Sequence, residues 1–333
     1  MKKKLFIGVV GLGVGYHHFN FLVRSKKCKM IAVCDFDQKK IDFIKKKFPN
    51  INTYQSFDLM IEKERLDLVI IASYDNYHCY QILKLINKKI NVFSEKPLCL
   101  NYEEFNKIKK SLNKNKNIKF SSNLVLRNSP QFKNLKKRIN LGEFKNIFYI
   151  QGEYNYGRKE KILNQWRSKI PYYSVTFGGG IHMIDLAKFF INKKAISVIG
   201  SGNKIVTKNS NFKFNDFTTG IIKFEGGAIM NVVSNFGCEI PHHHCLKVFA
   251  NNKTFVQEYN SAKIFSSRKK PNFKELDIKC EKKYKTKVLE SFVDSILTKK
   301  TPLVTKDDAL EVMAISLSLE KSIKTGKWEK IKY

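Results

Sequence analysis

A histidine and an aspartate stand three residues apart in GGGIHMIDLAKFF, residues 178 to 190. On a helix, His182 and Asp185 would lie close to one turn apart on the same face. There the carboxylate could accept a hydrogen bond from the imidazole and fix its tautomer. The three glycines permit two interpretations: a phosphate cradle at a helix start, or a turn that brings His182 close to another group.

A second glycine-rich turn, VVGLGVGYHH, follows an apolar run near the amino terminus. Gly11 allows a tight turn and Gly13 lets a pyrophosphate approach the backbone, whereas Tyr16 stands where the usual pattern has its third glycine. Asp35 ends the next apolar run, where an acid can accept hydrogen bonds from an adenosine ribose. We expect a dinucleotide to bind at Gly11, Leu12, Gly13, Gly15, Tyr16 and Asp35. A carboxylate there repels a 2′-phosphate, so NAD is favoured, with NADP as the alternative because lysines lie nearby.

A third segment, SEKPL, residues 94 to 98, places Glu95 and Lys96 after another apolar run. Doubly wound sheets bind their ligands at the carboxyl ends of such strands. A lysine beside a glutamate is also common on protein surfaces, so this segment alone does not define a site.

Two patterns of alternating residues predict the strands and helices that position these segments. Up to about residue 120, apolar runs alternate with lysine-rich amphipathic stretches, which predicts a doubly wound parallel sheet of the Rossmann type in residues 1–124. After that, alternating strands with hairpin signals at EGG and NNK predict an α+β domain with a large, mainly antiparallel sheet in residues 125–333. The expected class is α/β, and we expect the working site in the crevice between the two domains.

The net charge of +33 suggests nucleic acid as a partner. The lysines are spread from end to end, however, so a compositional bias explains the charge and we expect no nucleic-acid function. No apolar run approaches the roughly 20 residues of a membrane-spanning helix, and the amino terminus reads as a strand and its turn. The seven cysteines form no CxxC pair. We therefore expect a cytoplasmic protein with reduced thiols and no membrane association.

These motifs, in this order, resemble the Gfo/Idh/MocA family, the glucose–fructose oxidoreductase and inositol dehydrogenase group. The resemblance rests on GLGVGYHH, AVCD, ASYDNYH and EKP. It continues through NQWRSK, GGGIHMIDL and TPLVTKDDALEVMAISLSLEKSIKTGK, so it spans essentially the whole chain. It implies hydride transfer between a nicotinamide ring and a carbinol carbon, usually on a sugar, nucleotide sugar or cyclitol.

The resemblance also implies roles for individual residues. Glu95 would contact the nicotinamide ribose, and Lys96 would lie between that ring and the reacting hydroxyl, where an ammonium stabilises developing alkoxide charge. Pro97 would aim Lys96 through a cis peptide bond. The segment that follows the third strand would line the cofactor with Ser73, Asn76 and His78. In this segment, Tyr74 stands where relatives usually have a proline. Four residues would bind substrate: Arg127, Trp166, Arg167 and Asp185.

One departure affects the expected proton relay. Family members commonly carry an aspartate four residues before the histidine that corresponds to His182, and this chain has Gly178 there. Lys96 and His182 would then share the proton transfer as the catalytic residues, or Tyr172 or Tyr173 would join them. A dehydrogenase or reductase of CH–OH groups is the leading hypothesis. An NAD-dependent glycoside hydrolase and a non-catalytic NAD-binding protein are the alternatives.

The segment PHHHC, residues 241 to 245, resembles a cluster of metal ligands. Along a strand, His242 and His244 would face one way and His243 the other, so two histidines at most converge. A zinc site needs three or four ligands, and we expect no metal. Alternating apolar residues in IIKFEGGAIMNVV permit an exposed sheet face, and we expect a homo-oligomer, a dimer or tetramer.

Overall fold

The structure is a computed structural model that describes residues 4–259, 261–269, 273–276, 285–298 and 300–333. The chain forms two compact units, the first of Met1–Asn123 with Thr286–Leu310 and the second of Leu124–Lys285 with Glu311–Tyr333. The first break lies one residue from the expected boundary. The later segment 286–310, expected in the second domain, belongs to the first unit instead.

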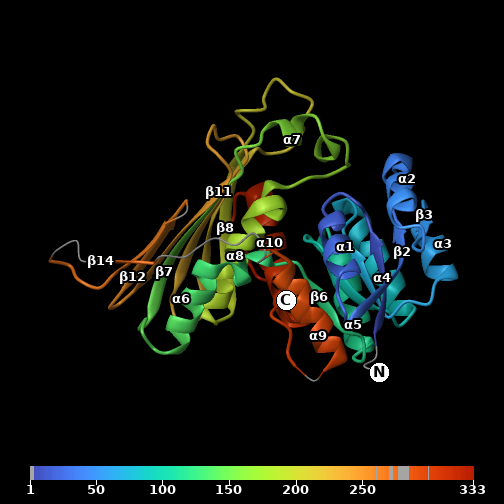
Figure 1. Ribbon diagram of the computed structural model, residues 1–333. Helices are drawn as coiled ribbons and strands as arrows, with labels where there is room; N and C mark the ends of the chain where they lie inside the picture. The colour runs from blue at the N-terminus through green and yellow to red at the C-terminus, as the bar shows by residue number, and fades with distance from the viewer. Residues whose placement is uncertain (1–3, 260, 270–272, 277–284, 299) are drawn as a thin grey trace. The chain divides into compact units, whose positions relative to one another are not determined.

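The first unit contains a six-stranded parallel sheet in the order β3-β2-β1-β4-β5-β6 (Figure 1). Its strands are β1 (Leu5–Val10), β2 (Cys28–Cys34), β3 (Asn52–Tyr54), β4 (Leu68–Ile71), β5 (Asn91–Ser94) and β6 (Phe120–Ser122). The strand order changes direction between β1 and β4, which is where sheets of this kind bind ligands. The predicted Rossmann sheet is confirmed.

Helices connect these strands. They are α1 (Gly15–Val23), α2 (Gln38–Lys47), α3 (Phe57–Lys63), α4 (His78–Asn87) and α5 (Tyr102–Lys114), with the 3₁₀ turn η1 (Asp75–Tyr77). The Asn101 side chain accepts a hydrogen bond from the Glu104 amide at 2.9 Å and caps the amino-terminal end of α5. Every residue of β4 is buried, as expected for a central strand covered on both faces.

The returning segment adds helix α9 (Lys287–Leu297) to this unit. Its Phe292 ring lies 5.7 Å from the Phe93 ring of β5, centroid to centroid. Ser121 donates to the Val304 carbonyl at 2.8 Å. These buried contacts explain why the segment belongs to the first core.

The second unit contains a nine-stranded sheet in the order β14-β13-β12-β11-β7-β10-β9-β8-β15. Its strands are β7 (Ile147–Asn155), β8 (Ala195–Asn203), β9 (Phe217–Phe224), β10 (Ile229–Asn235), β11 (His243–Ala250), β12 (Thr254–Glu258), β13 (Ser261–Phe265), β14 (Phe273–Glu275) and β15 (Glu329–Lys330). Strands β7 and β10 pair in parallel, and the other neighbours are antiparallel, which confirms the mainly antiparallel sheet. Hairpins occur at both predicted turns, EGG and NNK.

The second unit also contains helices and short turns, and the last helix begins in the first unit, which extends to Leu310. They are α6 (Pro130–Asn140), α7 (Glu160–Leu163), α8 (Ile181–Ile191), α10 (Lys306–Thr325), the 3₁₀ turns η2 (Val125–Asn128) and η3 (Trp166–Ser168), and the π-helical turn η4 (Thr176–Gly180). Helix α8 packs on β7, where a Cβ at Gly152 would lie 3.0 Å from the Met183 Cβ. Helix α10 lies on β8, and its Ser322 hydroxyl accepts a hydrogen bond from the Gly200 amide at 3.0 Å.

The opposite face of the sheet carries apolar side chains in register. Tyr149 is paired with Ile229 across β7 and β10, and Ile199 with Ile221 across β8 and β9. Ile221 and Ile229 are 40% and 38% exposed. Within the described part of the chain, no helix is long and apolar enough to cross a membrane.

Candidate functional site

The glycine-rich turn between β1 and α1 is shaped by two different constraints. Gly11 has φ +85°, and a Cβ there would overlap the Ala72 carbonyl of the neighbouring strand. Gly13 is exposed, and a Cβ there would meet nothing within 4 Å. The first glycine is therefore required by the turn, and the second leaves open space above the backbone at the start of a helix.

Gly15 stands one position before the third glycine of the usual pattern, and it serves packing. A Cβ there would lie 3.0 Å from the Ala72 Cβ and 3.3 Å from Val9 Cγ1, so its absence lets α1 lie close to the sheet. Tyr16 follows, and its ring contacts Phe19 and Phe43 at 5.9 and 5.7 Å between centroids. The Tyr16 ring thus packs against its neighbours, and its predicted contact with the cofactor stays a prediction.

Asp35, at the end of β2, is 5% exposed and points at the glycine-rich turn. Its carboxylate accepts hydrogen bonds from the Leu12 amide at 2.6 Å and the Asp37 amide at 2.9 Å. The Lys40 ammonium lies 3.2 Å from the same carboxylate. The acid is thereby fixed beside the turn, where it can accept hydrogen bonds from a ribose diol, and Lys40 lowers the local negative charge.

The loop after β4 carries three further predicted residues. Ser73 donates to the Gln81 side chain at 2.7 Å. His78 is fully buried, with Nδ1 2.6 Å from the Pro97 carbonyl and Nε2 3.1 Å from the Ser73 carbonyl. The imidazole therefore joins this loop to the one after β5. That is a positioning role, and a direct contact of His78 with the cofactor stays a prediction.

Glu95 and Lys96 follow β5 on the same edge of the sheet. The Glu95 carboxylate lies 2.9 Å from His18 Nε2 and accepts a hydrogen bond from the Asn123 amide at 2.7 Å. Burial would raise the pKa of Glu95, but the His18 hydrogen bond, the positive charge nearby and the Asn123 hydrogen bond together hold this pKa below its ordinary value. The peptide between Lys96 and Pro97 is cis, as the resemblance implied. Glu95 is therefore an anchored carboxylate directly before Lys96.

Two buried acceptors at this edge fit a dinucleotide. The side-chain oxygens of Asn76 and Asn123 are buried and accept no hydrogen bond from any described residue. Buried amide oxygens without a donor are uncommon, and hydroxyl or amide groups of a ligand would satisfy them. Together with the open space above Gly13 and the carboxylate of Asp35, they make this edge suited to NAD, which supplies a hydride acceptor when bound.

In the second unit, the three glycines of GGGIHMIDL lie in close contact with side chains of the same unit. A Cβ at Gly178 would overlap the Tyr173 hydroxyl, one at Gly179 the Tyr154 ring, and one at Gly180 the Ser234 hydroxyl. These close approaches form the π-helical turn η4, an irregularity that often marks functional sites. The turn leads directly into α8, so the glycines serve close packing before His182, and the approach of His182 to a substrate stays a prediction.

His182 stands in the first turn of α8 and is 5% exposed. Its ring lies 5.9 Å from the Tyr154 ring at an interplanar angle of 21°. Burial raises the pKa of Tyr154 above its ordinary value, so this hydroxyl stays protonated. His182 therefore packs against the Tyr154 ring of β7.

Tyr173 lies beside the turn and is 2% exposed. Its hydroxyl accepts a hydrogen bond from Arg167 Nε at 3.2 Å, and its ring meets the Trp166 ring edge to face at 5.9 Å. The Arg167 guanidinium carbon lies 4.7 Å from the Trp166 ring. The predicted substrate residues Trp166 and Arg167 therefore form one group with Tyr173.

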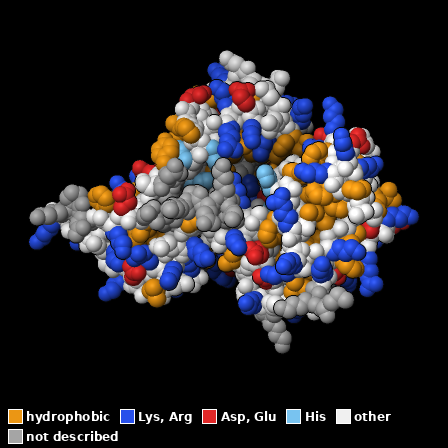
Figure 2. Space-filling view, viewed as in Figure 1, with side chains coloured by type: hydrophobic (Ala, Val, Ile, Leu, Met, Phe, Trp, Pro, Cys, Tyr) orange, Lys and Arg blue, Asp and Glu red, His pale blue; other side chains and the backbone are white. Residues whose placement is uncertain are grey.

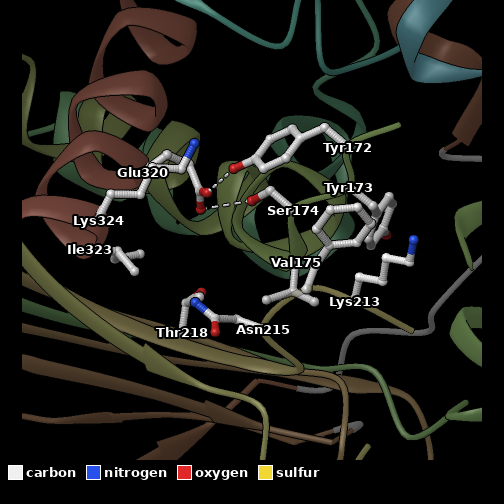
Figure 3. Close-up of a pocket in the computed structure, with 11 residues that line it drawn as sticks. Tyr172, Tyr173, Ser174, Val175, Lys213, Asn215, Thr218, Glu320, Ile323 and Lys324 are labelled. Atoms are coloured by element: carbon white, nitrogen blue, oxygen red, sulfur yellow. Dashed lines mark hydrogen bonds between the residues drawn. The ribbon is translucent and has the colours of Figure 1, made fainter. Parts of the chain in front are cut away.

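The segment before the turn is held by α10. The Glu320 carboxylate accepts hydrogen bonds from the Tyr172 hydroxyl at 2.5 Å and the Ser174 hydroxyl at 2.7 Å (Figure 3). Burial, with the neighbouring Glu320 charge and its hydrogen bond, raises the pKa of Tyr172. A cavity of about 190 Å³ adjoins these residues. Its lining is Tyr172, Tyr173, Ser174, Val175, Lys213, Phe214, Asn215, Thr218, Glu320, Ile323 and Lys324. Tyr172 is therefore a hydrogen-bond donor to Glu320, and this contact fixes the backbone beside Tyr173.

Arg127 and Asp185, both predicted to bind substrate, contact each other. Arg127 Nε lies 2.9 Å from Asp185 Oδ1 and 3.1 Å from Oδ2, and Nη2 lies 2.6 Å from Oδ1. Their side chains are 3% and 1% exposed. A buried two-pronged ion pair joins η2 to α8 and orders both. Their substrate roles stay predictions.

The three consecutive histidines divide between the two faces of the sheet, as predicted. His242 and His244 both contact Tyr154, at 5.2 and 4.8 Å between ring centroids, whereas His243 stacks on Tyr259 at 4.1 Å. Among the residues that the structure describes, no group of three or more His, Cys, Asp or Glu could hold a metal ion.

Several residues near the predicted ones escaped the sequence analysis. These are His18 and Asn123, which bind Glu95, Gln81, which binds Ser73, and the aromatic pair Tyr154 and Tyr156. His18 ends the segment GLGVGYHH and lies one turn into α1, close to the glycine-rich turn. This position could have indicated His18 as a residue of the site. The others are ordinary residues of strands and helices, and their pairing depends on long-range contacts.

Comparison with known proteins agrees with this geometry. Residues 5–123 match the GFO/IDH/MocA family described as "Oxidoreductase family, NAD-binding Rossmann fold", and residues 132–256 match the GFO/IDH/MocA C-terminal domain. The chain is 24% identical over 238 residues to myo-inositol 2-dehydrogenase of Thermotoga maritima, covering 69% of this chain and 67% of the relative. It is 22% identical over 344 residues to scyllo-inositol 2-dehydrogenase (NAD(+)) of Bacillus subtilis, covering 98% and 96%.

Among solved structures, myo-inositol 2-dehydrogenase of Lactobacillus plantarum superposes with a TM-score of 0.86 at 21% identity, over 99% of this chain and 100% of that one. This likeness establishes the fold. The family matches cover both units and name the cofactor domain. The chain is therefore an NAD-binding enzyme of the dehydrogenase and reductase type, and it belongs to the GFO/IDH/MocA oxidoreductase family.

Proposed function

We propose that this enzyme transfers a hydride between NAD and a carbinol or ketone carbon of a sugar, nucleotide sugar or cyclitol. The observation that carries the proposal is the anchored Glu95 directly before Lys96. His18 and Asn123 hold the carboxylate at 2.9 and 2.7 Å, so the backbone that presents Lys96 is fixed at the carboxyl edge of the sheet. A fixed ammonium at that edge is suited to stabilise alkoxide charge on a reacting hydroxyl.

In this proposal Lys96 and His182 carry the proton chemistry. Lys96 stabilises the developing alkoxide, and His182 takes the hydroxyl proton during oxidation and returns it during reduction. Tyr173 lies beside Gly178 with its hydroxyl bonded to Arg167, so a tyrosine hydroxyl stands where a side chain at position 178 would begin. Arg167 and Trp166 offer a donor and an aromatic face to a carbohydrate-type substrate.

The names of the relatives favour cyclitols within this range. Both relatives described above are named inositol 2-dehydrogenases, and the second name includes NAD(+). At 22–24% identity the substrate itself can differ, so free sugars and nucleotide sugars belong in the same screen.

The test is nicotinamide absorbance during turnover with myo-inositol, scyllo-inositol, common hexoses and nucleotide sugars. Lys96→Met should lower kcat by about 10² to 10⁴-fold, the range of general acid–base and electrostatic contributions. Lys88→Met, a change at an exposed lysine after α4, is the matched control and should leave kcat unchanged. Equal rates in wild type and Lys96→Met would contradict the proposal.

The same assay separates the other hypotheses. Release of an aglycone from a glycoside without net NADH would indicate the hydrolase. Tight NAD binding without turnover of any compound would indicate a non-catalytic protein.

We also propose that the enzyme is a homo-oligomer through the outer face of the nine-stranded sheet. The paired residues Tyr149 with Ile229, and Ile199 with Ile221, provide an apolar surface that a second copy would cover. Ile221→Glu should shift the mass measured by light scattering to that of a smaller species. An unchanged mass would contradict this interface.

A further inference from the structure

Basic side chains gather around one aromatic ring in the second unit. The guanidinium carbons of Arg158 and Arg167 lie 5.6 and 6.0 Å from the centroid of the Tyr156 ring. The His242 ring lies 5.4 Å from the same ring, and α7 adds Lys161. On the face drawn in Figure 2, histidine side chains lie beside lysine and arginine side chains near α7. We call Arg158, Lys161, Arg167 and His242 the basic cluster.

Two acids close in sequence to the cluster form contacts elsewhere. Glu160 accepts a hydrogen bond from the Asn164 side chain at 2.8 Å, and Glu239 pairs with Lys159 at 3.2 Å. Among the ion pairs of the described residues, none joins a carboxylate to Arg158 or Lys161. Arg158 and Lys161 therefore carry positive charge that these acids do not neutralise.

The charges within the cluster act on one another. Burial first, and then the charges of Arg158 and Arg167, lower the pKa of Lys161. Burial first, and then Arg158 and other neighbouring basic groups, lower the pKa of His242 to about 4. The Nδ1 atom of His242 is buried and has no hydrogen-bond partner among the described residues. At neutral pH, His242 is an uncharged imidazole in a positive environment, with one nitrogen available to a ligand.

The bias toward lysine does not account for this group. Of the 62 lysines and arginines in the chain, only seven are arginines. Two of these seven, Arg158 and Arg167, lie beside the same Tyr156 ring. Arginine presents a planar fork that binds a carboxylate or phosphate through two hydrogen bonds. The Trp166 ring lies beside the Arg167 guanidinium and adds an aromatic side chain to this group.

We propose that the basic cluster binds an oxyanion on the substrate, so that the enzyme acts on an acidic sugar or cyclitol that carries a carboxylate or a phosphate. This inference rests on the proposed function, since it names the substrate class of the same enzyme. Arg158 and Arg167 bind the oxyanion, and His242, in the tautomer protonated at Nδ1, donates a hydrogen bond to it. A neutral polyol offers the cluster no negative charge, so it binds more weakly.

The experiment compares matched pairs of probes by the fluorescence of Trp166, which adjoins Arg167. Trp328 is the only other tryptophan in the chain, so a Trp328→Phe background makes Trp166 the sole reporter. The probes, added in the presence of NAD⁺, are D-glucose against D-glucuronate and D-glucose 6-phosphate, and myo-inositol against myo-inositol 1-phosphate. Comparing the carboxylate probe with the phosphate probes shows which oxyanion the basic cluster binds.

We expect the acidic member of at least one pair to bind about tenfold or more tightly than its neutral partner, with this preference lost in Arg158→Gln. Lys159→Gln is the matched control, because it removes an equal charge next in sequence from a residue paired with Glu239. It should keep the preference. Neutral partners that bind as tightly as the acids, or an equal loss in Lys159→Gln, would overturn the inference.

Binding and turnover separate the two proposals. NADH formation from neutral compounds, without preferential binding of acids, overturns the acidic substrate class while hydride transfer stands. An acid that binds with the expected dependence on Arg158 supports the cluster even where no NADH forms, and only the proposed reaction then fails.

Discussion

The Tyr173 hydroxyl occupies the space in which a side chain at Gly178 would begin. A Cβ at position 178 would overlap this hydroxyl and would lie 3.0 Å from Tyr173 Cζ and 3.2 Å from Phe236 Cζ. Arg167 holds the hydroxyl from the other side at 3.2 Å. The glycine and the tyrosine are therefore mutually dependent, and the π-helical turn before His182 tolerates no larger residue unless Tyr173 moves.

Gly178→Ala should destabilise the second unit by about 1 to 3 kcal/mol, because overpacking a closely packed site forces neighbouring side chains to shift. In Tyr173→Phe the hydroxyl is absent, so the double variant should lose less stability than the sum of the two single variants, by at least about 0.5 kcal/mol. Urea unfolding, followed by tryptophan fluorescence, measures all four proteins.

The control is Gly13→Ala, since a Cβ at Gly13 would meet nothing within 4 Å. Its unfolding midpoint should match that of wild type. Strictly additive losses for Gly178→Ala and Tyr173→Phe would show that the two residues do not share this space.

The Arg127–Asp185 pair gives a prediction about stability. Removing one partner of a buried pair leaves an uncompensated charge, so Arg127→Met should cost about 3 to 5 kcal/mol, and Asp185→Leu a similar amount. The double variant, which buries neither charge, should be more stable than either single variant. The exposed pair Lys107 with Glu103 is the control, and Lys107→Met should leave the unfolding midpoint unchanged. A double variant that is less stable than both singles would contradict a structural role for the pair.

Much of the first unit was predictable from the sequence, and the reason is physical. A strand buried on both faces must be apolar throughout, as in β4, so the alternation of such runs with amphipathic helices indicates a parallel sheet. Gly11 and Asp35 were predictable because each stands at the carboxyl end of such a strand. The positions of these residues follow from local sequence.

Pairings between distant residues were not predictable. The apolar stripe of α9 shows that one face is buried, but it does not show that Phe292 meets Phe93 in the first core. Arg127 and Asp185 stand 58 positions apart, and nothing local to either shows that they pair. The contact between the Tyr173 hydroxyl and Gly178 likewise depends on the tertiary structure. The sequence alone therefore could not show whether Tyr172 or Tyr173 lies beside Gly178.

Asp35 gives a prediction about the cofactor. Asp35→Ala removes the acceptor for the Leu12 amide and the expected acceptor for the ribose, so KM for NAD should rise about tenfold or more, as hydrogen bonds to a charged group are worth roughly 1.5–3 kcal/mol. The change also removes the charge that repels a 2′-phosphate while Lys40 remains, so KM for NADP should fall. Asp42→Asn, at an exposed carboxylate on α2, is the control and should leave both constants unchanged. An unaltered ratio of the two constants in Asp35→Ala would contradict this role.

His244 gives a prediction about pH. Burial against Tyr154, followed by the charges of His242 and His243, lowers the pKa of His244 to about 3. The unfolded chain takes up a proton at this residue below about pH 6.5 and the folded chain does not, so stability rises with pH across this window. Between pH 7 and pH 5 the free energy of unfolding should therefore fall by on the order of 2 kcal/mol from His244 alone. Urea unfolding at pH 5, 6 and 7 should give a smaller slope for His244→Gln than for wild type, whereas His17→Asn, at an exposed position, should keep the wild-type slope. If His244→Gln lost stability as steeply as wild type on acidification, His244 would not be the group that resists protonation in the folded state.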